Sequence, residues 1–248
     1  MGKDGRVQNR PKGNGPLALV GSGEYLPEMA EVEAGLLEGR PPRYVQLATA
    51  SVPDGPSVVA RWHALGRAQA GRIGVEAVVL AVSDRGSADD PLIAAQVAGA
   101  GLVYLSGGHP AFLAETLRST LVWEAVLAAW QEGAALAGCS AGAMALSSRV
   151  PSLRHPGPEG VVGLGLLPHV RVIPHFDAFV ARAPGLVSSV LGEGGGGEEG
   201  VSVVGIDELT ALVGGPEHWE VKGRGSAWLL RPDGRVQVPA GATLETPS

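Results

Sequence analysis

Residues 134–147 read Ala-Ala-Leu-Ala-Gly-Cys-Ser-Ala-Gly-Ala-Met-Ala-Leu-Ser, and the expected architecture follows from this stretch. Ala134–Gly138 is a short aliphatic run typical of a buried strand, and the alanine-rich run Ala141–Ser147 favours a helix. Between them, the segment from Gly138 to Gly142 fits the pattern G-x-S-x-G with Ser140 at its centre. A strand that turns sharply into a helix at this pattern predicts a nucleophile elbow, where the flanking glycines relieve crowding.

The elbow predicts that Ser140 is a nucleophile. Its hydroxyl would lie at a helix N-terminus, whose dipole favours developing negative charge. The amide of Ala141 would be positioned to donate to an oxyanion. Cys139 is the rival nucleophile, but a cysteine elbow would be centred on the thiol, and residues 137 and 141 are both alanine.

A second glycine-containing loop, Ser106-Gly107-Gly108, follows the strand-like run Leu102–Leu105. Glycines at the carboxyl edge of a parallel sheet let backbone amides approach a ligand without interference from a Cβ atom. We therefore expect this loop to supply a second oxyanion-hole amide, from Gly108 or its neighbour. His109, which follows it, is a candidate contact for the substrate.

A serine nucleophile needs a base, and the chain has six histidines. Only His175 follows a strand-like run, Val170–Ile173, with an acid nearby at Asp177. An imidazole at that place could reach the elbow of a neighbouring strand, take the serine proton and return it to the leaving amine. His175 is therefore the predicted general base.

Aliphatic runs alternate with helical segments on the N-terminal side of the elbow. The expected strands are Leu17–Gly21, Tyr44–Ala48, Val75–Val82, Leu102–Leu105 and Ala134–Gly138. The expected helices are Ser57–Ala70, Pro91–Ala98, Ala111–Arg118 and Leu121–Glu132. Continuous aliphatic runs suit strands buried on both faces, and strand–helix alternation indicates right-handed βαβ units. The fold class is therefore α/β, a three-layer sandwich with a mainly parallel sheet.

After Gly163 the runs become short and closely spaced, which predicts a C-terminal β-meander that extends the sheet. Its expected strands are Val170–Ile173, Val201–Ile206, Ala211–Val213, Ala227–Leu230 and Val236–Val238. Gly192–Gly200 is a low-complexity segment expected to form a surface loop. We expect a disordered tail over residues 1–15, a single α/β domain over 16–240 and a second tail over 241–248.

Composition excludes several classes of function. The formal net charge of −6 argues against a nucleic-acid partner, and no apolar run is long enough for a signal peptide or a membrane span. A single cysteine cannot form an internal disulfide or a cysteine-based zinc site, so a cytoplasmic location is expected. Neither a glycine-rich phosphate motif nor a metal-binding constellation is present, so no cofactor and no metal are expected.

Several segments resemble the cyanophycinase and aspartyl dipeptidase (dipeptidase E) family of serine peptidases. The run from Gly138 to Ala143 resembles the nucleophile segment of that family, and Ser106-Gly107-Gly108 resembles its Gly-Gly loop. Gly163–Leu167, which leads to Ile173–Phe176, resembles its Gly-Leu-Gly-Leu and His-Phe segments. Val204–Leu212 resembles its late strand. The segments occur in family order and span about residues 100 to 213.

The resemblance implies a flavodoxin-like sheet, as in class I glutamine amidotransferases. It also implies hydrolysis of small acidic or β-aspartyl peptides through an acyl-enzyme on Ser140, with His175 as base. The acid of the triad is expected between these two residues, where Glu159 is the only carboxylate. Asp177 is the alternative, because glutamine amidotransferases use a His-x-Glu pair of that spacing. The position after the glycine pair is His109, where the family has Asn or Asp.

Other functions remain open at this stage. The same Ser140 could serve an esterase of the α/β-hydrolase fold, although the histidine of those enzymes lies far downstream of the serine. A binding protein that kept the amidotransferase-like fold and lost its triad is the non-enzymatic alternative. The expected partner is a small peptide substrate, with neither nucleic acid nor a membrane, and a homodimer is compatible with the sequence.

Overall fold

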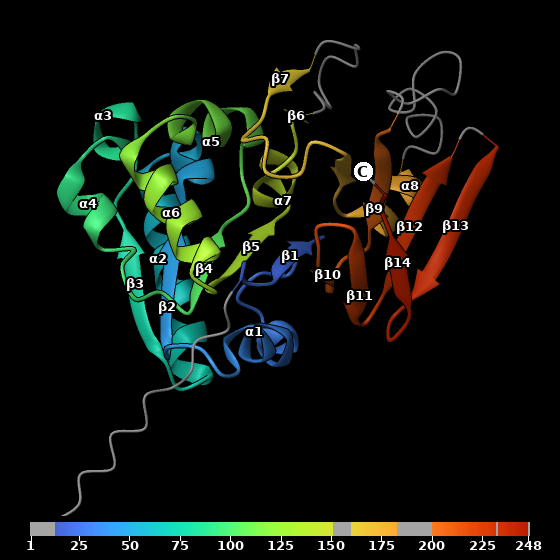
Figure 1. The fold of residues 1–248 in the computed structure, drawn as a ribbon, viewed down its shortest axis with the longest axis horizontal. Helices are drawn as coiled ribbons and strands as arrows, with labels where there is room; N and C mark the ends of the chain where they lie inside the picture. The colour runs from blue at the N-terminus through green and yellow to red at the C-terminus, as the bar shows by residue number, and fades with distance from the viewer. Residues whose placement is uncertain (1–12, 151–159, 183–199, 232, 248) are drawn as a thin grey trace, which may run out of the picture.

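The computed structural model describes residues 13–150, 160–182, 200–231 and 233–247. Eight strands form the main sheet in the order β14-β11-β10-β1-β5-β4-β2-β3 (Figure 1). Five of them are parallel: β1 (Leu17–Val20), β2 (Arg43–Leu47), β3 (Glu76–Leu80), β4 (Leu102–Leu105) and β5 (Ala135–Cys139). The other three are antiparallel: β10 (Thr210–Gly214), β11 (His218–Gly223) and β14 (Thr243–Glu245).

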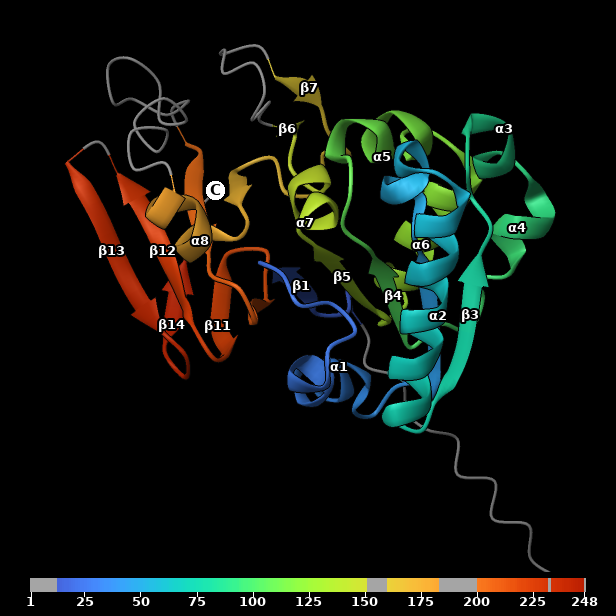
Figure 2. The same ribbon diagram turned by 180° about the vertical axis from the view of Figure 1, so that it is seen from behind.

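Helices cover both faces of this sheet, which confirms the predicted three-layer α/β sandwich (Figures 1 and 2). One face carries α1 (Ala30–Leu37) and α2 (Pro56–Arg72). The other carries α3 (Arg85–Ala88), α4 (Pro91–Ala95), α5 (Pro110–Leu117), α6 (Leu121–Gln131) and α7 (Ala141–Ala145). The short 3-10 helices η1 (Pro27–Met29) and η2 (Thr49–Asp54) complete this part of the chain.

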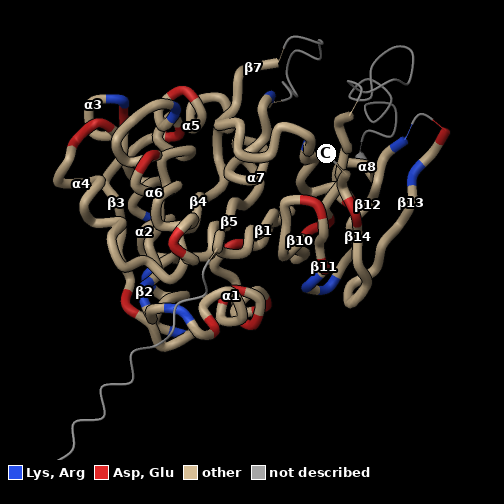
Figure 3. Tube along the Cα trace, viewed as in Figure 1, with Lys and Arg blue, Asp and Glu red and all other residues tan. Residues whose placement is uncertain are grey.

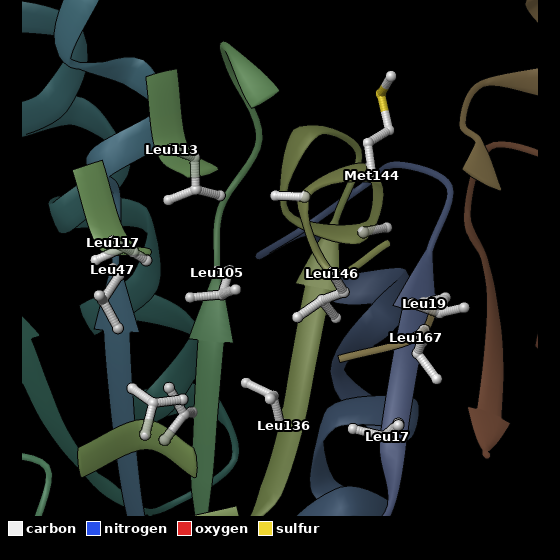
Figure 4. Packing of buried hydrophobic residues seen from close by; sticks show 14 of the residues in the cluster. Leu17, Leu19, Leu47, Leu105, Leu113, Leu117, Leu136, Met144, Leu146 and Leu167 are labelled. Atoms are coloured by element: carbon white, nitrogen blue, oxygen red, sulfur yellow. The ribbon is translucent and has the colours of Figure 1, made fainter. Parts of the chain in front are cut away.

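The core follows from the alternation of side chains along the parallel strands. In β1, Leu17 and Leu19 belong to the core on the face that carries α7, and Ala18 and Val20 belong to the core on the face that carries α1. Figure 4 shows the first of these cores, with Leu105 of β4 and Leu113 of α5 packed between strand and helix. All four residues of β4 are buried, as expected for a strand covered on both faces.

A second, four-stranded sheet has the order β13-β12-β9-β8. Its strands are β8 (Val170–Ile173), β9 (Ser202–Ile206), β12 (Ser226–Arg231) and β13 (Gly234–Pro239), and β8 runs parallel to β9. Helix α8 (Phe176–Arg182) contributes Phe176 to a small core on this sheet. A two-stranded pair, β6 (Arg149–Val150) and β7 (Val161–Val162), follows α7.

The predicted meander is therefore divided between the two sheets. Of its five predicted strands, only the one that corresponds to β10 extends the main sheet, where it is joined by β11 and β14. The predicted tail over 241–248 is wrong where β14 pairs with β11. The predicted tail over 1–15 ends earlier, because Gly15 exchanges two hydrogen bonds with Trp130 of α6. The segment Gly192–Gly200 lies, except for Gly200, outside the described residues.

The charges are unevenly distributed along the described chain. Figure 3 shows acidic positions gathered around α1, where Glu31 and Glu33 occupy the first turn, and basic positions scattered over the molecule. Within the described residues, none of the helices combines the length and the apolar character needed to cross a membrane.

Candidate active site

Ser140 occupies a sharp turn between β5 and α7. Its backbone has φ 49° and ψ −107°, and its N–H donates to the carbonyl of Val20 in the neighbouring strand at 2.9 Å. A Cβ atom on Gly142 would lie 2.3 Å from the carbonyl oxygen of Leu105, and one on Gly138 would lie 2.5 Å from the carbonyl carbon of Gly142. The turn therefore needs glycine on both sides of Ser140.

His175 lies immediately beyond β8, just before α8, and has a positive φ of 51°. Its Nε2 atom is 3.1 Å from Oγ of Ser140, and its Nδ1 atom is 3.1 Å from Oε1 of Glu208. The His175 and Glu208 side chains are 43% and 48% exposed. Both contacts are satisfied by a neutral imidazole that carries its proton on Nδ1 and accepts the serine hydroxyl at Nε2.

The backbone of Glu208 is held on both sides in the loop between β9 and β10. Its N–H donates to Oδ1 of Asp177 at 3.0 Å, and the hydroxyl of Thr210 donates to its carbonyl oxygen at 3.0 Å. The preceding residue, Asp207, accepts hydrogen bonds from the backbone N–H of Ser226 and the indole of Trp228. Glu208 is thereby directed at His175 by a loop that is tied to the second sheet.

The two acids named from the sequence have different places. Asp177 contacts the backbone of Glu208 rather than the imidazole of His175, and Glu159 lies outside the described residues. Glu208 lies in the segment Val204–Leu212 but was not predicted as a site residue. The signal for it was the pair Asp207-Glu208 directly after a buried run. Because β8 and β9 are parallel neighbours, their carboxyl ends meet, and the residues that follow them come together.

The loop after β4 lies against the elbow. A Cβ atom on Gly107 would be 3.4 Å from Cβ of Ser140, and one on Gly108 would be 2.3 Å from the carbonyl oxygen of Ala50. The N–H of Gly107 donates to Oε1 of Glu24 at 2.9 Å, so this amide is engaged. The predicted oxyanion amides are those of Gly108 and of Ala141, which is the first residue of α7 and has no acceptor within its helix.

His109, the predicted substrate contact, is the N-cap residue of α5. Its Nε2 atom lies 2.8 Å from Oδ1 of Asp54 in η2, and the two side chains are 37% and 43% exposed. His109 therefore directly follows the Gly107-Gly108 loop and is paired with a carboxylate.

Cys139 does not compete with Ser140 in this geometry. Its side chain is fully buried, and Sγ donates to Oε2 of Glu24 at 2.8 Å. Burial, with the neighbouring Glu24 charge, raises the pKa of the Cys139 thiol well above its usual value. Because the thiolate is the reactive form of cysteine, the neutral thiol is a poor nucleophile. Among the described residues, no group of three or more His, Cys, Asp or Glu side chains is arranged to hold a metal ion.

The contacts form a continuous series from a hydroxyl to an imidazole to a carboxylate. This is the arrangement of a nucleophile, a base that activates it and an acid that orients the base. The three residues come from distant segments, and each follows the end of a strand: β5, β8 and β9.

The chain was compared with known proteins. The model of peptidase family S51 matches residues 17–217, a range that contains Ser140, His175 and Glu208. The crystal structure of a peptidase from an acI-B1 actinobacterium is 40% identical, covers 94% of this chain and 98% of its own, and superposes with a TM-score of 0.85. A peptidase E-like protein from Listeria monocytogenes EGD-e shares the fold at 16% identity, with coverage of 91% and 98% and a TM-score of 0.54. None of the curated proteins matches the chain.

Proposed function

The chain belongs to peptidase family S51, as its resemblance to cyanophycinases and aspartyl dipeptidases implied, and we propose that it is a serine peptidase in which Ser140, His175 and Glu208 form the catalytic triad. The observation that carries this proposal is the series of contacts from Ser140 Oγ through both ring nitrogens of His175 to Glu208, each of 3.1 Å. In the proposal, Glu208 takes the role that the sequence had suggested for Glu159.

The geometry supports a two-step acyl transfer. Oγ of Ser140 attacks the scissile carbonyl as Nε2 of His175 takes the hydroxyl proton, and Glu208 accepts the Nδ1–H of the imidazolium. The amides of Gly108 and Ala141 would donate to the oxyanion of the tetrahedral intermediate. His175 then gives its proton to the leaving amine. In the second step a water molecule attacks the acyl-enzyme while His175 again acts as base, which releases the carboxylic acid product and restores Ser140.

We propose small acidic or β-aspartyl peptides as substrates and the cytoplasm as the place of the reaction. The substrate class rests on the resemblance of the nucleophile, Gly-Gly and His-Phe segments to peptidases that cut beside aspartyl residues. His109 is proposed as a substrate contact, because it adjoins Gly108 at the start of α5.

Labelling with a fluorophosphonate probe tests the nucleophile. We expect a single covalent adduct on Ser140, no adduct on the Ser140→Ala variant and strongly slowed labelling of His175→Ala. Ser148→Ala is the matched control, because the hydroxyl of Ser148 donates to the carbonyl of Pro168 and has no role in the proposed triad. An unlabelled wild-type chain would favour the decayed binding protein over an enzyme.

A parallel activity panel tests the substrate class. β-Aspartyl dipeptides, α-aspartyl dipeptides, neutral dipeptides and a nitrophenyl ester are offered at the same concentration. We expect the two acidic series to be cleaved and the neutral series to be cleaved far more slowly. Turnover confined to the ester would identify an esterase that uses the same serine.

A further inference from the structure

The loop that follows β1 contacts both the loop after β4 and the residue that precedes Ser140. It reads Gly21-Ser22-Gly23-Glu24-Tyr25, and its glycines do not fit a phosphate-binding motif. Glu24 is 8% exposed, and its two carboxylate oxygens have different partners. Oε1 accepts from the N–H of Gly107 at 2.9 Å, and Oε2 accepts from Sγ of Cys139 at 2.8 Å.

These two partners directly precede the atoms that matter in the proposed reaction. Gly107 precedes Gly108, whose amide is one proposed oxyanion donor. Cys139 precedes Ser140, which carries the nucleophile and is followed by the second proposed donor, Ala141. The buried carboxylate of Glu24 therefore links the loop after β4 to the end of β5, next to both proposed oxyanion donors.

The next residue contributes a second attachment. Tyr25 has a positive φ of 65°, and its hydroxyl lies 2.6 Å from Oγ of Ser106. Its ring packs against that of Tyr104, with centroids 5.3 Å apart. Strained backbone of this kind persists only where the surroundings hold it firmly. The loop after β1 thus contacts Ser106, Gly107 and Cys139 through two successive side chains.

We propose that Glu24 is a positioning residue that sets the separation of the Gly108 and Ala141 amides and so shapes the oxyanion hole. This inference rests on the proposed function of Ser140. An ionised carboxylate is an acceptor at both oxygens, so it can hold an N–H and an S–H donor at once. A neutral residue of the same size cannot accept at both places.

If Glu24 positions the oxyanion donors, loss of its contacts should affect the rate of the reaction rather than the binding of substrate. Oxyanion donors act on charge that develops only in the transition state, and removal of one costs about 10² to 10³ in kcat in a well-studied serine protease. Displacement of donors by about 1 Å can cost about 10²-fold. Loss of the Glu24 contacts should therefore lower the maximal rate and leave ground-state affinity nearly unchanged.

The test compares Glu24→Leu, which keeps bulk without acceptors, with Glu24→Gln, which keeps one acceptor for Gly107. Labelling by the fluorophosphonate is resolved into the maximal rate, kinact, and the apparent affinity, KI. We expect Glu24→Leu to lower kinact about 10²-fold with KI nearly unchanged. We expect Glu24→Gln to lower it roughly fivefold, about the effect of one ordinary hydrogen bond. Glu33→Leu is the matched control, since Glu33 is another buried glutamate and accepts from the hydroxyl of Tyr44.

A spectroscopic measurement tests the contact itself. The chain has one cysteine, so the S–H stretching band in the infrared belongs to Cys139 alone. We expect the band to move to higher wavenumber in both Glu24 variants, because the thiol loses a charged acceptor, and to stay in place in Glu33→Leu. A change in general stability would not produce this pattern.

The outcomes separate the two proposals. A wild-type chain that the probe does not label at Ser140 refutes the proposed function. A labelled wild type with unchanged kinact in Glu24→Leu, or with an unmoved S–H band, overturns the role of Glu24 alone. If Glu24→Leu does not fold, Glu24→Gln decides in the same way, because unchanged kinact in that variant also overturns it.

Discussion

Backbone strain at single residues is concentrated around Ser140. Five non-glycine residues of the described chain have positive φ angles, and three of them are Ser140, His175 and Leu209, which follows Glu208. A fourth, Tyr25, follows Glu24. Each strained residue costs of order 1–3 kcal/mol and is kept only where the surrounding structure fixes it. The contacts of Val20, Thr210 and Ser106 with these turns supply that constraint.

The first prediction at this scale separates the three candidate acids. Glu208→Gln should lower kcat/KM for an acidic dipeptide by about 10⁴, because an amide that orients the imidazole can impose the wrong tautomer. Asp177→Asn should cost less than about tenfold, because the asparagine oxygen can still accept from the N–H of Glu208. Glu159→Gln should leave kcat/KM near the wild-type value.

Steady-state kinetics on the three variants with one substrate provides the measurement. A greater loss in Asp177→Asn than in Glu208→Gln would contradict the assignment of Glu208. Equal, near-wild-type values for all three would leave a dyad of Ser140 and His175.

At the scale of elements, the close packing of the turn between β5 and α7 predicts that one added methyl group, in Gly142→Ala, strongly destabilises the fold. Gly142→Ala would place a Cβ atom 2.3 Å from the carbonyl oxygen of Leu105, so α7 would have to move away from β4. We expect a loss of several kcal/mol in the free energy of unfolding and loss of labelling at Ser140.

Gly35→Ala in α1 is the matched control, because a Cβ atom there meets nothing within 4 Å. It should stabilise the chain by about 0.5–1 kcal/mol. Denaturant unfolding measures both, and equal effects would show that the elbow tolerates a side chain.

A further prediction concerns the contact between α1 and β2. Glu33 is 1% exposed and accepts a hydrogen bond from the hydroxyl of Tyr44 at 2.9 Å. Burial raises the pKa of Glu33 from 4.5 to about 7. The folded state therefore binds this proton more tightly than the unfolded state, and stability falls as the pH rises from 4.5 to about 7. The shift corresponds to about 3 kcal/mol.

Glu33→Gln keeps an acceptor for Tyr44 and removes the titration. We expect its free energy of unfolding, relative to the wild type, to increase by about 3 kcal/mol between pH 4 and pH 8. Urea unfolding at several pH values measures this difference. A constant difference across that range would contradict the raised pKa.

Elements with continuous aliphatic sequence could be predicted, and elements with mixed sequence could not. The strands β4 and β8 have the bounds expected from Leu102–Leu105 and Val170–Ile173. Helix α1 was missed because a buried acid, Glu33, interrupts its apolar face. Strand β11 was missed although it alternates, with Trp219 and Val221 buried between neighbours that are exposed or half-buried. That period of two was a usable signal.

The candidate site could be predicted only in part, for a reason of topology at the scale of the whole molecule. Ser140 and His175 were predicted as catalytic residues because each follows an aliphatic, strand-like run and belongs to a sequence motif. In the predicted meander, consecutive strands would run in opposite directions, and their carboxyl ends would lie at opposite edges of the sheet. That prediction therefore gave no reason to place His175 next to Glu208. In the structure β8 and β9 are parallel and belong to a second sheet, whose strands β9 and β12 contact β10 of the main sheet (Figure 1).

The last prediction concerns the edge strand β14, which the sequence had assigned to a tail. Leu244 is 3% exposed, and the hydroxyl of Thr246 accepts from the indole N–H of the buried Trp219 at 2.8 Å. Deletion of residues 243–248 would remove a buried leucine and leave that N–H without its partner, a loss of roughly 3 to 5 kcal/mol. For a chain of this length the thermal midpoint should fall by about 10 °C.

The deletion should nevertheless leave the rate of fluorophosphonate labelling at Ser140 unchanged well below the new midpoint, because β11 and β10 separate β14 from β1 and β5. His218→Ala is the control at the same edge: its pair with Glu245 is 3.4 Å long and largely exposed, so its removal should not move the midpoint measurably. Thr246→Val tests the indole contact separately and should account for about 1 to 3 kcal/mol of the loss. An unchanged midpoint in the deletion variant would mean that residues 243–248 form a tail in solution. Slower labelling at an unchanged fold would mean that this edge of the sheet does help to hold the site.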